Sequence, residues 1–327
     1  MRVKISDNAI NILTAKAYRG IGRAWIVRRL RGNETTNSIV SLLNEDAKEE
    51  RHITPEDFES NRETIKSHIG KLAGFADGVI AIGDPNFPSY RGNVKNSEQP
   101  VVLFYRGELS LLKKTNKNVA VIGLLNPDKD TEIIESEVVS VLVNNGATIV
   151  SGLALGCDSI AHRQALRSNG KTVAILPSPL NEILPAANKE LADEIVRNHG
   201  LLITEYYEKA KSKMELSGRY QERDRLQALF SDCVVLSASY AKNDLGNDSG
   251  SRLAMEYALN YSIPRSVIYD PASNSGNPKY DLNRQLIREQ GGIIVINREN
   301  LESAVRRIMS NHPGVQKEPL GQPDLFG

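Results

Sequence analysis

The sequence has 327 residues, of which 40% are hydrophobic and 25% are charged, and its formal net charge is +1. This composition is typical of a globular protein with a large core and more than one structural unit. No segment reaches the roughly 18 apolar residues that a membrane span needs, and the N-terminal stretch MRVKISDNAINIL lacks the apolar core of a signal peptide. We therefore expect a cytoplasmic protein with no membrane association.

The two cysteines, Cys157 and Cys233, are too few for a disulfide framework or a Cys-rich zinc site. The five histidines are scattered, and none forms an H-x-x-x-H or H-E-x-x-H pair. We predict no metal site and no cofactor.

Residues 1–74 are expected to form a small all-helical domain, SAM-like or helix-hairpin-helix-like, because apolar positions recur with helical spacing. Its third helix is expected to begin at TPEDF, where Thr54 is a good N-cap and Pro55 a good first residue. The stretch KAYRGIGRAWIVRRLR (16–31) has six basic residues and no acid. Within it, the turn around Gly20 and Gly22 is either a secondary DNA contact or plain packing; its candidate residues are Arg19, Gly20, Gly22, Arg23 and Arg28.

Residues 75–310 alternate short apolar runs with helical stretches. Continuous Val and Ile runs suit strands that are covered on both faces, so we predict an α/β domain with an extended Rossmann-like, doubly wound, mostly parallel sheet. In such a sheet, ligands bind beyond the carboxyl ends of the strands, where the strand order reverses. The runs are VAVIG (119–123), ATIVS (147–151), TVAILP (172–177), LLITEY (201–206), CVVLSAS (233–239), RSVIYD (265–270) and GIIVIN (292–297).

The stretch SGLALGCDSIAHRQAL (151–166) is expected to be the end of a strand, a turn and a helix. Gly152 and Gly156 let a ligand approach the main chain, and the N-terminal end of the helix suits an anion. The alternative is a turn that only packs tightly.

This stretch resembles the SGLARGID..AH signature of the DNA-processing protein A (Smf) family, whose members bind single-stranded DNA and load the RecA recombinase during transformation. Further similarities follow in the family's order across residues 75–270. The family's lead-in strand with D..YP and P..LF.RG is matched by IAIGDPNFPSYR and PVVLFYRGELSLL. Its YP..N and LLSEY are matched by LPAAN and LLITEY. Its RNRIIAGLSDVVLV and SGSLITA..AL are matched by RDRLQALFSDCVVL and SGSRLAMEYAL. The resemblance implies a phosphate or nucleotide pocket at the turn.

The residues that the resemblance and the residue chemistry assign to DNA or phosphate binding are Ser151, Gly152, Gly156, Asn188, Arg219, Arg223, Arg225, Ser249, Gly250 and Ser251. Arg219 lies one helical turn before Arg223, so we expect several guanidinium groups near one phosphate chain. In the alternative, Glu222 and Asp224 neutralise the arginines in an exposed ion-pair face, and the Ser249–Ser251 segment only caps a helix.

Three departures from the family pattern remove positive charge. Leu124 and Leu125 follow Gly123 where the family has Ser-Arg, Leu155 replaces a basic residue, and Ala186 stands at an often basic position. Fewer cations weaken nucleic-acid binding.

A catalytic role is not expected. His162 with Asp158 one turn earlier is a candidate base, with Ser151 as the nearby nucleophile, but a structural histidine is the simpler interpretation. The PGGxGT..E motif of related nucleotide hydrolases is absent, although Glu256 follows SGSRLAM. We predict no catalytic residue.

The last segment, 311–327, is rich in Pro, Gly and polar residues and is expected to be a flexible tail. Its QPDLF resembles the short motif by which bacterial DNA-repair proteins engage the sliding clamp. Gln322, Leu325 and Phe326 are therefore candidate clamp contacts.

These features favour a non-catalytic protein that binds single-stranded DNA and is accessory to recombination, DNA uptake or repair. The resemblance implies loading of the RecA recombinase and a homodimer. Two alternatives remain open: a nucleotide-signal sensor, in which Leu124, Leu125 and Leu155 line an apolar pocket for a base, and a nucleotide hydrolase of the same fold superfamily that acts in defence against foreign DNA.

Overall fold

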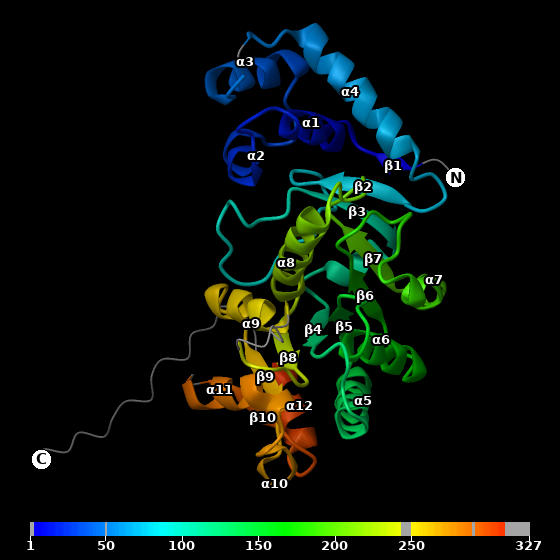
Figure 1. Cartoon of the computed structure of the whole chain (residues 1–327). Coiled ribbons are helices and arrows are strands. Elements are labelled where there is room, and N and C mark those ends of the chain that lie inside the picture. Colours follow the sequence, from blue (N-terminus) through cyan, green and yellow to red (C-terminus); the bar gives the residue numbers. More distant parts are fainter. Residues whose placement is uncertain (1–2, 50, 243–249, 290–291, 311–327) are drawn as a thin grey trace, which may run out of the picture.

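The computed structural model describes residues 3–49, 51–242, 250–289 and 292–310 and contains one ten-stranded sheet with helices on both faces (Figure 1). Across the sheet the strand order is β1-β2-β3-β7-β6-β5-β4-β8-β9-β10. β3 is antiparallel to its neighbours β2 and β7, and the other neighbouring pairs are parallel. The mostly parallel α/β fold predicted from the sequence is confirmed.

The seven apolar runs named above form β4 to β10. The strand bounds are β1 Lys4–Ile5, β2 Gly78–Ala81, β3 Val102–Gly107, β4 Lys117–Ile122, β5 Ala147–Ser151, β6 Thr172–Ile175, β7 Leu201–Thr204, β8 Cys233–Leu236, β9 Arg265–Ile268 and β10 Ile294–Ile296. Strand β1 has only two residues, too few for a period-two pattern, and the sequence interpretation missed it.

The helices divide between the two faces of the sheet. In β4, Val119 and Val121 pack into the core that α5, α6 and α12 cover, whereas Ala120 and Ile122 pack into the core beneath α8, α9 and α11. Figure 1 shows α8 and α9 on the opposite side of the sheet from α5, α6 and α7. The bounds are α5 Lys129–Asn144, α6 Cys157–Arg167, α7 Lys189–Arg197, α8 Lys213–Leu229, α9 Gly250–Asn260, α10 Pro271–Asn274, α11 Asp281–Glu289 and α12 Leu301–Ser310.

The sheet is doubly wound around β4. From β4 the chain proceeds through β5 and β6 to β7, and it then crosses to the other side of β4, where β8, β9 and β10 follow. The strand order therefore reverses between β4 and β8. The crevice beyond the carboxyl ends of these strands is the place where this topology binds ligands.

The N-terminal residues form four helices: α1 Asp7–Lys16, α2 Arg23–Arg29, α3 Thr36–Asp46 and α4 Pro55–Gly70. Thr54 and Asp57 form a capping box at the start of α4, with Pro55 in the first turn, so the helix start predicted at TPEDF is confirmed. It is the fourth helix rather than the third. The hydrophobic core of this helical part continues into β2 and β3 of the sheet, which makes the two parts one packed body.

A buried ion network joins the helical part to the sheet. Glu205, which follows β7, pairs with Arg225 of α8 and, at 3.2 Å, with Arg23 of α2. Arg23 also pairs with Glu222 at 2.7 Å. Burial opposes the ionisation of Glu205, but the charges of Arg225, Arg23 and Lys16 outweigh burial and lower the pKa of the Glu205 carboxyl. The arginines thus neutralise carboxylates that are buried where the helical part contacts the sheet domain.

We predict that Glu205→Gln destabilises the chain by about 2–3 kcal/mol, because Arg225 and the partly buried Arg23 lose the buried carboxylate that they share and keep only the half-exposed Glu222. Urea unfolding followed by far-ultraviolet circular dichroism measures the loss for the whole chain, and the fluorescence of Trp25, the single tryptophan, reports on the helical part. The control is Glu45→Gln, whose partner Arg29 lies 3.6 Å away in a half-exposed pair, so its loss is expected to stay below about 1 kcal/mol. Equal effects of the two variants would contradict the prediction.

Candidate functional site

A cavity of about 450 Å³ lies beyond the carboxyl ends of β4 and β5, next to the point where the strand order reverses. Its walls come from the segments after these two strands, from α8 and from the start of α9. The lining residues are Ile122, Gly123, Leu125, Ala154, Leu155, Asp158, Pro185, Tyr220, Arg223, Asp224, Gln227, Gly250, Ser251 and Ala254. The cavity volume is in the range of small-molecule sites, about 300–1,000 Å³.

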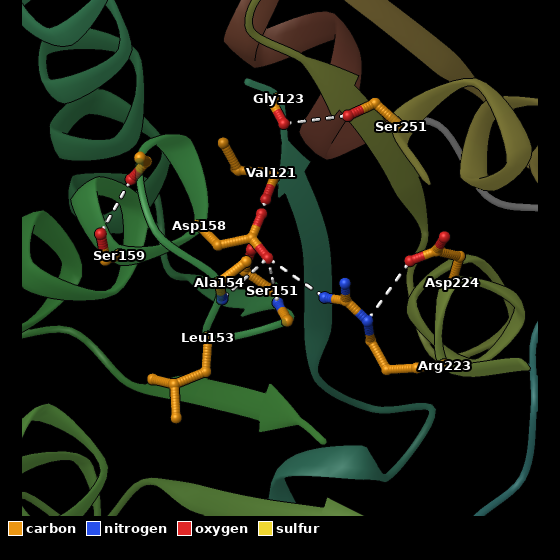
Figure 2. A network of polar contacts seen from close by, with 12 residues as sticks. Val121, Gly123, Ser151, Leu153, Ala154, Asp158, Ser159, Arg223, Asp224 and Ser251 are labelled. Carbon is orange, nitrogen blue, oxygen red and sulfur yellow. Dashed lines mark hydrogen bonds and ion pairs between the residues drawn. The ribbon is translucent and has the colours of Figure 1, made fainter. Parts of the chain in front are cut away.

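The turn after β5 is held together by its own polar groups. One carboxylate oxygen of Asp158 accepts hydrogen bonds from the main-chain amides of Gly152 and Ala154, each at 3.2 Å (Figure 2). The Ser151 hydroxyl donates to the Val121 carbonyl at 2.7 Å. The expectation that this turn offers its amides to a phosphate is therefore wrong for Gly152 and Ala154, because a carboxylate of the chain already binds them.

Both glycines of the turn stand where a side chain would collide with neighbouring atoms. Gly156 has a φ of +69°, and a Cβ there would lie 2.2 Å from the Leu124 carbonyl oxygen. At Gly152 a Cβ would lie 1.1 Å from Nη1 of Arg223. What approaches Gly152 is thus a guanidinium of the chain itself.

Arg223 lies between two carboxylates on the cavity floor. Its Nη1 is 3.1 Å from Asp158, and its Nε is 3.3 Å from Asp224 (Figure 2). Burial raises the pKa of Asp224 to about 7, with Arg223 opposing the shift and Asp158 adding to it. The three groups together carry a charge between −1 and zero near neutral pH, so the floor does not offer the surplus positive charge that a phosphate needs.

The three arginines expected to line one phosphate chain point to different places. Arg225 pairs with Glu205 and with Glu222, because its position two residues after Arg223 turns it to another face of α8. Arg219 pairs with Glu215 at 2.6 Å, donates to the Glu208 carbonyl, and stacks on Tyr206. The expected convergence of the three is therefore wrong. Ion pairing, the alternative, takes place, but the three arginines are buried, whereas their partners Glu215 and Glu222 are half-exposed.

The remaining predicted residues frame the cavity. The buried Asn188 side chain donates to the carbonyls of Leu153 and Ala154 and so fixes the turn from behind. Gly250 begins α9, and a Cβ there would lie 2.6 Å from the Asp224 carboxylate. The Ser251 hydroxyl donates to the Gly123 carbonyl at 3.0 Å. Ser249 lies outside the described residues.

The three leucines expected to line an apolar pocket separate into two kinds. Leu125 is 58% exposed and Leu155 is 47% exposed, and both line the cavity. Leu124 is 4% exposed and belongs to the core. The apolar rim expected for a base is therefore present at two of the three positions. The expectation that Leu124 lines the pocket is wrong, because its side chain is buried in the core.

The candidate catalytic pair is not formed. His162 lies within 2.7 Å of Thr172 Oγ1, and since the Thr172 hydroxyl donates to the Ile149 carbonyl, Nδ1 of His162 is the donor. Burial lowers the pKa of His162 to about 4, while Asp158 is engaged with Arg223. This histidine is a neutral core residue at neutral pH.

Sequence reasoning missed Tyr220 and Gln227 as cavity residues and treated Asp224 only as a neutralising charge. Tyr220 precedes Arg223 by three residues and Gln227 follows it by four, so all three lie on one face of α8. This spacing was the available signal.

The basic N-terminal stretch is divided in the structure. Arg23 is engaged with Glu205 and Glu222, so its expected role as a DNA contact conflicts with its place in the network. Arg19, Gly20, Gly22 and Arg28 are exposed, and Gly20 has a φ of +88° in the turn before α2. The clamp-motif residues Gln322, Leu325 and Phe326 lie outside the described residues.

The described ranges carry neither a membrane span nor a cluster of metal-binding side chains. They contain no helix that is both long and apolar enough to cross a membrane. They also contain no group of three or more His, Cys, Asp or Glu side chains arranged to hold a metal ion.

The family model of DNA recombination-mediator protein A matches residues 78–305 of the chain. DNA processing protein DprA of Streptococcus pneumoniae is 34% identical over 176 residues, which are 52% of this chain and 58% of that protein. Protein Smf of Escherichia coli is 28% identical over 207 residues, which are 63% of this chain and 51% of that protein. The chain thus spans little more than half the length of these curated relatives.

Two solved structures resemble the fold, one over nearly the whole chain and one over two thirds of it. The crystal structure of DprA from Streptococcus pneumoniae has a TM-score of 0.70 at 24% identity and covers 95% of this chain and 100% of its own. The structure of DNA processing protein A from Helicobacter pylori, which concerns the single-stranded DNA binding mode of that protein, has a TM-score of 0.52 at 29% identity. It covers 67% of this chain and 95% of its own.

We predict that Gly152→Ala lowers the free energy of unfolding by about 3–5 kcal/mol, because the new methyl group displaces Arg223 from its buried pair with Asp158. The control is Gly218→Ala on the same helix as Arg223, where a Cβ meets no atom within 4 Å and the better helix propensity is expected to add about 1 kcal/mol. Urea unfolding measures both. A Gly152→Ala protein as stable as the parent would show that Arg223 moves away without loss.

We predict that His162 makes the chain acid-labile. The folded-state pKa of about 4 lies below the unfolded value, so the stabilising contribution is complete above about pH 6.5 and falls by up to about 3 kcal/mol as the pH decreases to about 4. In His162→Asn, whose amide nitrogen replaces Nδ1 as donor, the decrease in unfolding free energy between about pH 7 and about pH 5 is expected to be smaller. Parallel pH profiles of parent and variant would contradict the assignment of a neutral buried histidine.

Proposed function

The chain belongs to the DNA recombination-mediator protein A family, as the motif resemblance indicated, and on that premise we propose that it binds single-stranded DNA without cutting it. In this proposal it acts as an accessory factor in recombination, DNA uptake or repair. The observation that carries the proposal is the cavity beyond β4 and β5, to which α8 contributes Tyr220 and Arg223. Binding at the carboxyl ends of parallel strands is the general rule for this topology.

The charge of the cavity favours a base rather than a phosphate inside it. Asp158 and Asp224 balance Arg223, whereas Leu125 and Leu155 present apolar surface at the rim. Bases have an apolar face that stacks on such surface, and base stacking on side chains is worth about 1–3 kcal/mol in single-stranded DNA binding. The sugar-phosphate backbone then stays outside the cavity, where cations supply a salt-dependent share of the affinity.

The absence of cleavage is proposed from the engagement of the polar side chains. The Ser251 hydroxyl donates to a main-chain carbonyl, and Asp158 is bound by two amides and a guanidinium. A nucleophile or general base needs a free side chain within reach of the reacting atom. Four further proposals rest on the sequence. We propose that the chain transfers DNA to a RecA-type recombinase and forms a homodimer. We also propose that the surface with Arg19 and Arg28 is a second DNA contact and that the tail binds the sliding clamp.

A second candidate function is a sensor of a nucleotide signal. The exposed Leu125 and Leu155 at the mouth of the cavity favour this second function. Their apolar surface suits a free base and a base within a DNA strand equally. Thermal shifts measured with single-stranded oligonucleotides and with free nucleotides separate the two candidates, since the ligand that binds the folded state raises the melting temperature.

We predict that the chain binds oligothymidylate in a salt-sensitive manner and that Leu155→Lys strengthens this binding, because it places a cation at the rim of the cavity. The slope of log affinity against log salt is expected to steepen by about 0.7 for one added phosphate contact. Tyr220→Ala is expected to weaken binding by about 1–3 kcal/mol through lost stacking. Fluorescence anisotropy of a labelled strand at several salt concentrations measures both effects.

Leu259→Lys is the matched control, since Leu259 is 48% exposed and lies outside the cavity lining. Equal gains from Leu155→Lys and Leu259→Lys would remove the cavity from the DNA-binding surface. Absence of oligothymidylate binding by the parent chain and both variants would refute single-stranded DNA binding altogether.

A further inference from the structure

The floor of the cavity has more hydrogen-bond acceptors than donors. Asp224 contributes a carboxylate and Gln227 an amide oxygen. Asp158 contributes a second carboxylate, one oxygen of which is already bound by two amides and Arg223. Among the described lining residues, the charged donor is the Arg223 guanidinium, which both carboxylates already contact. The Gln227 amide nitrogen and the Tyr220 hydroxyl are neutral donors. A ligand that complements this floor has to bring several N–H donors.

Gln227 shows that one acceptor lacks its donor. The residue is 1% exposed and lies one turn after Arg223 on α8. Its Oε1 is buried and has no hydrogen-bond partner within the part of the chain that the structure describes. Leaving a buried acceptor unpaired costs free energy that a ligand donor recovers.

The walls around this floor suit a flat ring. Leu125, Leu155, Ala154 and Ala254 present apolar groups, and Pro185 and Tyr220 add ring surfaces. An apolar wall with a few polar groups at its base is the usual form of a site that orients a heteroaromatic ligand. The floor then determines which ring edge fits.

We propose that the cavity binds a guanine base, through the N1–H and N2 amino donors of guanine to the carboxylate and amide acceptors on the floor and through O6 to Arg223. This inference rests on the proposed function, which it makes more specific. Thymine donates only from N3–H, between two carbonyl oxygens that face the carboxylates unfavourably. Adenine and cytosine each donate from a single amino group, whereas guanine adds a ring N–H beside its amino group and so supplies more of the donors that the floor needs.

Asp224 is the residue that we assign to this specificity. It stands between Arg223 and Arg225 on α8, is 3% exposed, and lines the cavity with its carboxylate 3.3 Å from Nε of Arg223. A site built to accept hydrogen bonds from a ligand discriminates strongly against a ligand without those donors, because its buried acceptors stay unpaired. The same carboxylate disfavours a phosphate group in the cavity.

The first experiment compares strands by fluorescence anisotropy: oligothymidylate, the same strand with one central dG, and the same strand with deoxyinosine, which lacks the N2 amino group, at that position. The dG strand is expected to bind about tenfold more tightly than oligothymidylate, as expected for one hydrogen bond to a charged acceptor. The deoxyinosine strand is expected to lie between them. Equal affinities of the three strands would overturn the guanine proposal while single-stranded DNA binding stands, and no binding of any strand would refute the proposed function itself.

The second experiment uses Asp224→Asn, which keeps the shape of the side chain. The dG preference is expected to fall toward one, and oligothymidylate binding is expected to strengthen because a negative charge leaves the cavity. Asp130→Asn, an exposed aspartate on α5 outside this cavity, is the matched control and is expected to retain the preference. A full dG preference in Asp224→Asn would overturn the role of Asp224.

The pH dependence gives a readout that a purely structural role does not produce. Guanine binds the ionised form of Asp224, whose pKa is about 7, so the dG preference is expected to rise by at most about tenfold between about pH 6 and about pH 8. In Asp224→Asn it is expected to stay flat. A flat profile in the parent chain would exclude Asp224 as the acceptor.

Arg223 of α8 and Asp158 of α6 act directly on this carboxylate, and its charge acts on Tyr257 of α9. Further away, His162 of α6 and Glu135 of α5 interact with Asp158, and Tyr220 of α8 lies against Arg223. The pKa of His162 is about 4, and burial raises the pKa of Tyr257 above its usual value, so neither changes charge over this pH range. Burial raises the pKa of Glu135 to about 8. Because Glu135 is present in both proteins, the comparison with Asp224→Asn isolates Asp224.

Free guanosine distinguishes the two sources of the base. Displacement of the labelled dG strand by guanosine, but not by thymidine, supports the proposed chemistry whether the base belongs to a strand or to a nucleoside. A thermal shift with guanosine together with equal affinities for the dG and oligothymidylate strands would assign the cavity to the free nucleoside. The same shift with guanosine and thymidine would overturn guanine recognition.

Discussion

The Asp158 carboxylate connects the two faces of the sheet at the candidate site. It accepts hydrogen bonds from the amides of Gly152 and Ala154 in its own turn, and it pairs with Arg223 of α8 on the other face. Because a buried charge that loses its partner costs several kcal/mol, the turn, α6 and α8 are held in one arrangement. The shape of the cavity between them follows from that constraint.

The same interaction determines which ligand chemistry the cavity favours. The glycine-bracketed turn of the family is retained, but its amides at Gly152 and Ala154 are bound internally, and Arg223 is balanced by Asp158 and Asp224. Leu125 and Leu155 lie exposed at the mouth. The turn therefore borders a cavity whose walls are apolar and whose arginine is balanced by carboxylates, so its electrostatics favour the edge of a base over a phosphate.

The helical N-terminal part uses positive charge in a different way. Arg23 lies in the densest basic stretch of the chain, yet it binds Glu205 and Glu222 of the sheet domain. Together with Arg225 it compensates the carboxylates that the contact buries. Arg19 and Arg28 stay exposed, so only part of the basic stretch is available to an external anion such as DNA.

The sequence by itself determined the elements whose signals are local. The continuous Val and Ile runs predicted β4 to β10, and Thr54 and Pro55 predicted the start of α4. The glycine turn lies beside the cavity at the carboxyl ends of the strands. Only the tertiary structure decided how each charge is used: Arg223 pairs with a residue 65 positions away, and Arg23 pairs with one 182 positions away. Hydrophobic periodicity and capping act over a few residues and can be read along the chain, whereas the field at a buried arginine depends on carboxylates that folding brings beside it.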